Sequence, residues 1–163
     1  MEKNKSLKEI KNCRLCNSPE LKKFINLGKI PLGNNLQTNQ KIAFKCDAYP
    51  LEIIRCNDCN HFQLSIAIDP KLLYAKNYTY LSGIGLSFVS HLENYANWAY
   101  EKFHLKEDSF VIDIGSNDGT CLKFFKEKNC KVLGVDPASK PAEIANNNGI
   151  KTINAFFDKE IAD

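Results

Sequence analysis

Short apolar runs alternate with helix-like segments through the second half of the chain. The apolar runs cover residues 110–114, 132–135 and 150–154. Between them, residues 120–128 and 141–147 place apolar side chains at helical spacing. A longer helix is predicted over 87–105, with one buried stripe formed by Phe88, Leu92, Tyr95, Ala96, Ala99 and Phe103. Strands that alternate with helices favour an α/β fold with a parallel sheet.

The first half of the chain has the pattern of a small β domain. A strand is expected from Phe24, broken at Gly28 and followed by a turn around Pro31. A second strand is expected over Tyr49–Cys56, with residues 61–65 as its hairpin partner. Residues 70–76 are expected to form a short helix that leads into the second half.

A polar, glycine-containing turn follows the first apolar run of the second half. The run ends in D-I-G-S-N-D-G, which places Asp113 two residues before Gly115 and six before Gly119. The next run ends at a second acid, Asp136. A strand, glycine loop, helix, strand and terminal acid form a unit that binds nucleotides, because the loop backbone approaches the ligand and the acid accepts hydrogen bonds from ribose hydroxyls.

The letters of this loop resemble the first motif of the class I S-adenosylmethionine-dependent methyltransferases. The resemblance implies S-adenosylmethionine as cofactor, with binding residues Asp113, Gly115, Ser116, Asn117, Gly119 and Asp136. Common versions of the motif carry a third glycine where this chain has Asn117. Asparagine tolerates positive φ better than other non-glycine residues, so the loop conformation is expected to survive. The alternative interpretation is an ordinary α/β loop with no ligand.

Four of the seven cysteines form two C-x-x-C motifs, 39 residues apart. The motifs comprise Cys13, Cys16, Cys56 and Cys59. Two such pairs fit a closed, tetrahedral and structural zinc site, whereas a single pair would also fit redox chemistry. Cys46 is an alternative ligand of lower rank, and Cys121 and Cys130 are interpreted as small buried hydrophobic residues.

The composition excludes some classes of partner but does not indicate a function. The 163 residues are 44% hydrophobic and 25% charged, with a formal net charge of +3 at pH 7. That charge is too small to indicate a nucleic-acid partner. No apolar run is long enough for a membrane span, and the first residues lack the apolar core of a secretory signal. The sequence therefore predicts a cytoplasmic protein without a membrane partner.

Several motifs in a fixed order resemble the sugar C-methyltransferases. They are C-R-L-C, L-G-x-x-P-L-x-N, P-L-x-x-x-x-C-x-x-C-x-x-x-Q-L, Y-T-Y-L-S-G, I-G-S-N-D-G-T and G-V-D-P-A, and they run from about Asn12 to the end. The resemblance implies methylation of a carbon atom of a nucleotide-linked keto-deoxysugar. It also implies that Tyr78 and Ser82 line the cofactor and substrate cleft, although packing of the tyrosines between two domains is an alternative.

The predicted organisation has three parts. They are a zinc-binding domain over 12–68, a helical linker that lines the cleft over 69–106, and the first half of a Rossmann-like cofactor domain over 107–163. Such a cofactor domain needs about seven strands, and we expect only three here. The family's acid–base residues would lie beyond Asp163, so the catalytic residues are not identified.

Two functions are therefore weighed. The first is an N-terminal portion of a C-methyltransferase that is inactive alone, from a truncated or split gene, and that needs a complementing C-terminal chain. The second is a non-catalytic zinc module that binds a partner chain or binds the cofactor weakly. In the first case the central strand over 110–114 would be left as an apolar edge.

Overall fold

The computed structural model describes residues 7–75 and 78–163. The chain divides into two compact units, an N-terminal unit that ends at Leu73 and a C-terminal unit over Tyr74–Asp163. Among the described residues, no helix combines the length and the apolar character that crossing a membrane requires.

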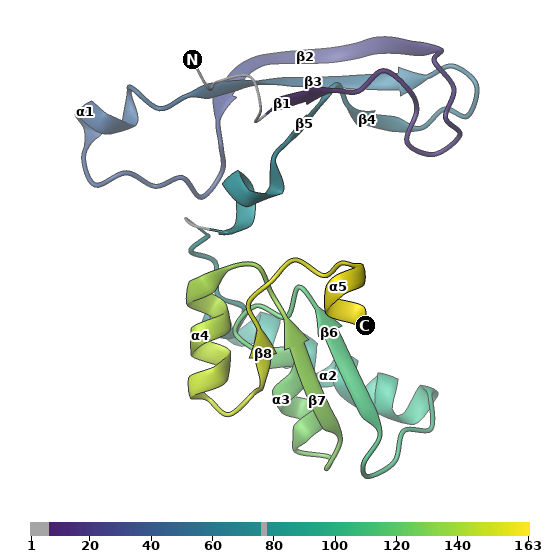
Figure 1. Cartoon of the computed structure of the whole chain (residues 1–163), viewed down its shortest axis with the longest axis vertical. Coiled ribbons are helices and arrows are strands. Elements are labelled where there is room, and N and C mark those ends of the chain that lie inside the picture. Colours follow the sequence, from purple (N-terminus) through teal and green to yellow (C-terminus); the bar gives the residue numbers. More distant parts are fainter. Residues whose placement is uncertain (1–6, 76–77) are drawn as a thin grey trace. The chain divides into compact units, whose positions relative to one another are not determined.

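The N-terminal unit is built from antiparallel strands, of which β2 and β3 are long and the other three are short (Figure 1). Its elements are β1 (Leu7–Glu9), β2 (Leu21–Pro31), α1 (Gln40–Ala43), β3 (Ala48–Cys56), β4 (Phe62–Leu64) and β5 (Ile66–Ile68). β2, β3 and β4 pair in that order, and β1 pairs with β5. The predicted hairpin between the strand ending at Cys56 and the segment after it is present as β3 and β4.

The predicted break at Gly28 is wrong, because β2 continues through it to Pro31. The pairing register with β3 shifts between Asn26 and Lys29, and Gly28 lies in this irregularity with a φ of 83°. The side chain of Asn26 accepts a hydrogen bond from the Gly28 N–H at 2.7 Å. Glycine therefore forms a bulge, a feature that the sequence alone does not distinguish from a strand end.

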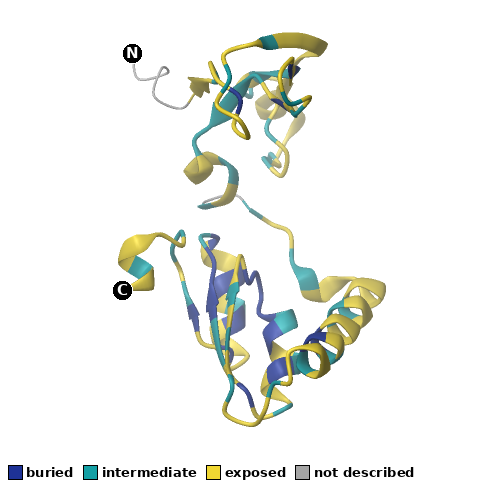
Figure 2. Cartoon of the chain, turned by 90° about the vertical axis from the view of Figure 1, so that its right-hand side faces the viewer, coloured by how far each residue is buried: buried dark blue, intermediate teal, exposed yellow. Residues whose placement is uncertain are grey.

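The N-terminal unit buries very little apolar surface. Among its described residues, the buried hydrophobic side chains are those of Cys13, Ile54 and Cys56. Figure 2 shows the same imbalance, since most of the long β2 strand is exposed. Two of the three buried residues belong to the C-x-x-C motifs, so the cysteine cluster occupies the place of a hydrophobic core.

The C-terminal unit is a parallel α/β layer (Figure 1). A π-helical turn, η1 (Lys71–Ala75), leads into it from the N-terminal unit. Its other elements are η2 (Ser82–Ile84), α2 (Leu86–Lys102), β6 (Phe110–Ile114), α3 (Thr120–Lys126), β7 (Lys131–Val135), α4 (Ser139–Asn147), β8 (Thr152–Ile153) and α5 (Lys159–Ala162). The strands lie in the order β6-β7-β8, so the whole chain has the mixed α/β class that its pattern predicts.

Three helices cover one face of this sheet. Buried residues of α2, α3 and α4 pack with Val111 and Val132, which point to the same side. On the opposite side of β6, Phe110, Ile112 and Ile114 are each about half exposed or more, at 60%, 47% and 59%. β6 pairs with β7 alone among the described strands, so it is both an edge strand and an apolar one.

The stripe predicted on α2 is correct in its centre and wrong at its aromatic positions. Ala96 and Ala99 are buried, but Tyr95 and Phe103 are exposed. The small alanine side chains pack in one cluster with Phe125 of α3. The large aromatic side chains of Tyr95 and Phe103, beside these alanines, remain exposed. The ring centroid of Trp98 lies about 6 Å from the centroids of both.

Candidate functional site

The two C-x-x-C motifs bring four sulfur atoms together. The Sγ atoms of Cys13, Cys16, Cys56 and Cys59, here called the four-cysteine cluster, all lie within 4.8 Å of one another. The pairs Cys13–Cys59 and Cys16–Cys56 are separated by 3.5 and 3.6 Å. Zinc–thiolate bonds of about 2.3 Å in a tetrahedron give sulfur–sulfur distances of about 3.8 Å. The donor set and its spacing therefore fit zinc.

Each motif forms the same turn. The N–H of Asn17 donates to the carbonyl of Cys13 at 2.9 Å, and the N–H of Asn60 donates to the carbonyl of Cys56 at 3.0 Å. Both asparagines adopt a left-handed conformation with φ of 62°. The repeated pattern C-x-x-C-N is the sequence signal for these turns, because asparagine is the non-glycine residue best suited to positive φ.

A buried glutamine ties the first turn to β4. The side-chain oxygen of Gln63 accepts a hydrogen bond from the N–H of Arg14 at 2.9 Å, and its amide nitrogen donates to the carbonyl of Asn12 at 3.2 Å. Gln63 is only 9% exposed. It therefore fixes the backbone on both sides of Cys13, although nothing in the sequence pattern identified it as part of the site.

The cysteine environments favour thiolate at the first position of each motif. A hydrogen bond from the Cys16 N–H is the main reason that the pKa of Cys13 is lowered to about 6. The N–H of Cys59 lowers the pKa of Cys56 in the same way. For Cys59 itself, the N–H of His61 acts in the lowering direction, but burial and the neighbouring thiols raise its pKa to about 12. Four thiolates this close repel one another, and a divalent cation offsets that repulsion.

The glycine loop joins β6 to α3 and is hydrogen-bonded to the end of β7. The N–H of Gly115 donates to the carbonyl of Val135 at 2.8 Å. The carboxylate of Asp136, 6% exposed, accepts from the N–H of Asn117 through one oxygen and from the N–H of Ala138 through the other, both at 2.8 Å. A carboxylate has about four acceptor positions, so two remain for ligand hydroxyls.

Gly115 and Gly119 have different structural reasons to be glycine. Gly115 has φ of 84° and open space where a side chain would begin, so a ligand can approach its backbone. Gly119 has φ of 78°, but a Cβ there would lie 2.9 Å from Cγ2 of Ile150. Gly119 therefore permits close packing behind the loop.

Burial and the two acids Asp113 and Asp136 shift the pKa values of groups near the loop. Burial, followed by the charge of Asp136, raises the pKa of Asp113. Burial and then Asp113 raise the pKa of Cys121 to about 11, so Cys121 remains a neutral thiol, as its interpretation as a small hydrophobic residue requires. Burial, followed by Asp136, also raises the pKa of Tyr78.

Residues 80–83 run beside the same loop. Asn117 bonds to the Ser82 N–H and to the carbonyl of Tyr80, and Asp118 accepts from the Gly83 N–H. The structure thus brings Ser82 to the predicted loop. Sequence reasoning missed Asp118, because an acid just before a helix is usually explained as a helix cap.

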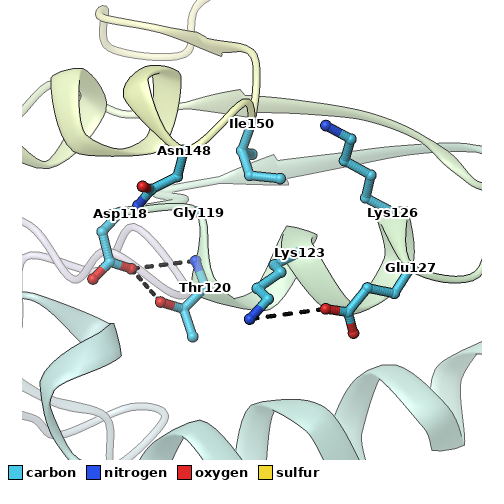
Figure 3. Close-up of a pocket in the computed structure, with 8 residues that line it drawn as sticks. All are labelled: Asp118, Gly119, Thr120, Lys123, Lys126, Glu127, Asn148 and Ile150. Carbon is cyan, nitrogen blue, oxygen red and sulfur yellow. Dashed lines mark hydrogen bonds and ion pairs between the residues drawn. The ribbon is translucent and has the colours of Figure 1, made fainter.

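A separate pocket lies along α3 (Figure 3). Of the predicted cofactor residues, only Gly119 lines it; Asp118, which was not predicted, lines it as well. Its charged groups are already paired: Lys123 with Glu127 at 3.8 Å, and Lys126 with the carbonyl of Gly149 at 2.7 Å. This pocket is therefore not the candidate cofactor site.

The hydroxyl of Ser116 is buried without a hydrogen bond among the described residues. Its Oγ has no hydrogen-bond partner within the described part of the chain, and the residue is 4% exposed. Ser116→Ala is therefore expected to raise the free energy of unfolding by about 1 kcal/mol, because an unsatisfied buried hydroxyl is removed. Urea denaturation measures this change. A loss of stability would instead mean that the hydroxyl has a partner, such as water.

Comparison with known proteins agrees with a zinc-binding domain, the class that the four-cysteine cluster indicates. Residues 13–74 match the family model Methyltransf_13, whose description is "Putative zinc binding domain". Together with the four-cysteine cluster, this match supports zinc as the metal.

A curated relative extends the similarity beyond the metal site. The chain is 29% identical over 157 residues to the C-methyltransferase NovU of Streptomyces niveus. The alignment covers 96% of this chain, which spans 37% of the length of that relative. These findings confirm the resemblance to the sugar C-methyltransferases that the ordered motifs indicate.

Proposed function

We propose that this chain supplies a zinc-stabilised domain and part of the S-adenosylmethionine cradle of a C-methyltransferase. The observation that carries the proposal is the tie between the Asn117 N–H and the Asp136 carboxylate at 2.8 Å. This bond holds the carboxylate of Asp136 against the glycine loop. The same carboxylate would accept hydrogen bonds from the ribose hydroxyls of the cofactor. The similarity to a C-methyltransferase along 96% of the chain supports the same assignment.

The proposed substrate is a nucleotide-linked keto-deoxysugar, and the proposed location is the cytoplasm. When bound, the cofactor would supply an electrophilic methyl group for a sugar carbon made nucleophilic by loss of a proton next to the ketone. The residues of this chain would bind and orient the cofactor through Gly115 and Asp136. The base would come from polypeptide outside this sequence, so we expect the chain alone to lack turnover.

The bare face of β6 supports a role for further polypeptide. Phe110, Ile112 and Ile114 expose an apolar row beside an unpaired strand edge, counted over the described strands. Exposed apolar edges of this kind associate with other strands unless they are covered. We propose that the remaining part of the enzyme, continuous or as a complementing chain, covers this face.

The zinc is proposed to be structural, because four thiolates fill its coordination sphere.

Calorimetric titration tests the cofactor assignment. S-adenosylmethionine and its demethylated product are titrated into the zinc-loaded chain and into Asp136→Ala, Asp136→Asn and Glu143→Ala. Glu143 is an exposed acid on α4, so its loss changes the net charge equally. We expect saturable binding that Asp136→Ala weakens at least about tenfold, about 1.4 kcal/mol, with a smaller loss for Asp136→Asn and none for Glu143→Ala.

Two results would contradict the assignment. Absence of binding in a folded, zinc-loaded chain would favour a non-catalytic zinc module. Equal weakening by Asp136→Ala and Glu143→Ala would mean that binding depends on general charge and not on the loop. Thermal denaturation of each variant establishes that it remains folded before affinities are compared.

A further inference from the structure

A strap, defined as Tyr78–Gly83, is held against the glycine loop by two consecutive side chains. Asn117 Oδ1 accepts a hydrogen bond from the Ser82 N–H at 2.9 Å, and Asn117 Nδ2 donates to the carbonyl of Tyr80 at 3.0 Å. Asp118 Oδ2 accepts from the Gly83 N–H at 2.8 Å. Three backbone groups of the strap are therefore bonded to side chains of the loop.

The contact is close enough to require glycine in the strap. A Cβ at Gly83 would lie 2.9 Å from the hydroxyl of Thr120 and 3.0 Å from Oδ2 of Asp118. Both of those groups are held in place, because the Thr120 hydroxyl donates to Oδ1 of Asp118 at 2.6 Å. By contrast, a Cβ at Gly85 would meet only Cβ of Phe88, at an ordinary distance of 3.8 Å.

Asn117 links the strap to the acid of the proposed cofactor site. Its N–H donates to Asp136, its side chain binds Tyr80 and Ser82, and its φ is 51°. Glycine would satisfy the backbone conformation and the bond to Asp136. It could not make the two side-chain bonds. The departure from the usual glycine pattern therefore has a physical role here.

The two aromatic residues of the strap, Tyr78 and Tyr80, pack against each other. The ring of Tyr78 packs 6.4 Å from that of Tyr80 and 5.8 Å from that of Tyr74, measured between centroids. The pKa of Tyr78 is raised by burial and then by the charge of Asp136, which agrees with a position facing this acid. Movement of the strap would therefore move two tyrosines relative to Asp136.

We propose that Asn117 and Asp118 are positioning residues that clamp the strap to the glycine loop and so couple the order of the strap to occupation of the loop by the cofactor. The coupling rests on the proposed function, but the clamp itself does not. Neither residue needs to touch the cofactor through its side chain. Both act through the backbone of the strap, which presents Tyr78 and Tyr80.

Hydrogen exchange of the full chain without cofactor tests the clamp. In Asn117→Gly the loop keeps its backbone conformation, yet the Ser82 amide loses its acceptor. We expect exchange at Ser82 to accelerate by about tenfold or more, because a partly buried amide loses its bond. Gly83→Ala should accelerate exchange at Ser82 and Gly83, whereas Gly85→Ala should leave both unchanged. Unchanged exchange in Asn117→Gly would overturn the clamp.

A second measurement tests the coupling to the cofactor. The demethylated cofactor is titrated into the parent chain, Asn117→Gly and Asn117→Asp, and exchange of the strap is followed at saturation. Reciprocal linkage requires that a ligand which orders the strap binds less tightly when the strap is released. We expect several-fold weaker binding and no added protection at Ser82 in Asn117→Gly. Asn117→Asp keeps the acceptor and should restore part of both.

The outcomes separate the two proposals. Saturable binding with equal affinity in the parent chain and Asn117→Gly overturns the coupling while the proposed function stands. If the parent chain binds no cofactor, the proposed function fails and the coupling fails with it, whereas loss of exchange protection in Asn117→Gly still supports the clamp. Restoration by Asn117→Asp supports a role for the side chain, because a general structural defect would not respond to one retained acceptor.

Discussion

Cys56→Ser is expected to unfold the N-terminal unit and leave the β6-β7-β8 sheet folded. Cys56 is completely buried, it ends β3, and its Sγ lies 3.6 Å from that of Cys16. Structural zinc sites contribute about 10–16 kcal/mol of apparent binding free energy, and in small domains this is folding free energy. Loss of one thiolate removes a large part of that amount.

The interactions seen among the described residues of this unit are too small to compensate. Its buried hydrophobic residues, over the described positions, are Cys13, Ile54 and Cys56, while Phe24 and Phe44 are 64% and 81% exposed. Within the described part of this unit, the salt bridge between Lys23 and Glu52 at 3.1 Å contributes at most about 1 kcal/mol because Lys23 is exposed. Without the metal, the entropy cost of ordering the strands would exceed these contributions.

Nuclear magnetic resonance and native mass spectrometry of the full chain measure this effect. In Cys56→Ser, the amide signals of residues 7–73 should collapse to unfolded positions and the bound zinc should be lost, while signals of the C-terminal unit remain dispersed. Cys46→Ser is the matched control, because Cys46 lies outside the four-cysteine cluster and contacts the carbonyl of Ile42 at 3.7 Å. Retention of one zinc and of a folded unit in Cys56→Ser would contradict the structural role.

The sequence predicted the elements whose signal is local. C-x-x-C spacing indicated the four-cysteine cluster because each turn depends on only four or five consecutive residues. The glycine loop and the strands β6 and β7 were predicted for the same reason, since Asp113, Gly115 and Asp136 lie at fixed offsets from apolar runs.

Features that depend on distant partners were not predictable. Gln63 is separated from Arg14 by 49 positions, and Ser82 from Asn117 by 35, so neither contact leaves a periodic pattern. The aromatic positions of α2 were misjudged because hydrophobic spacing identifies a face without showing that Ala96 and Ala99 are buried at its centre. The binding role of Asn117 and the three-part division of the chain stay predictions.

Gly134→Ala is expected to destabilise the C-terminal unit by about 1–3 kcal/mol, the usual cost of forcing extra volume into a packed site. Gly134 lies in β7, the middle strand, opposite Asp113 on one side and Thr152 on the other. A Cβ at this position would clash with Oγ of Ser116 and would lie 2.6 Å from Oγ1 of Thr152. Both contacts are far inside van der Waals range, so the side chains of Ser116 and Thr152, or the segments that carry them, must move.

Urea denaturation followed by tryptophan fluorescence measures this cost, because the single tryptophan, Trp98, lies on α2 of the same unit. Gly85→Ala is the control, since its added Cβ meets ordinary contact distances. Ser116→Gly in the Gly134→Ala background should recover part of the lost stability, because one of the two clashing side chains is removed, and the two effects should therefore be non-additive. A cost below about 0.5 kcal/mol, or strict additivity, would show that Ser116 does not pack over Gly134. Because Ser116 belongs to the glycine loop, Gly134→Ala should also weaken cofactor binding if the loop forms the cradle. The packing of the middle strand would then affect the proposed site.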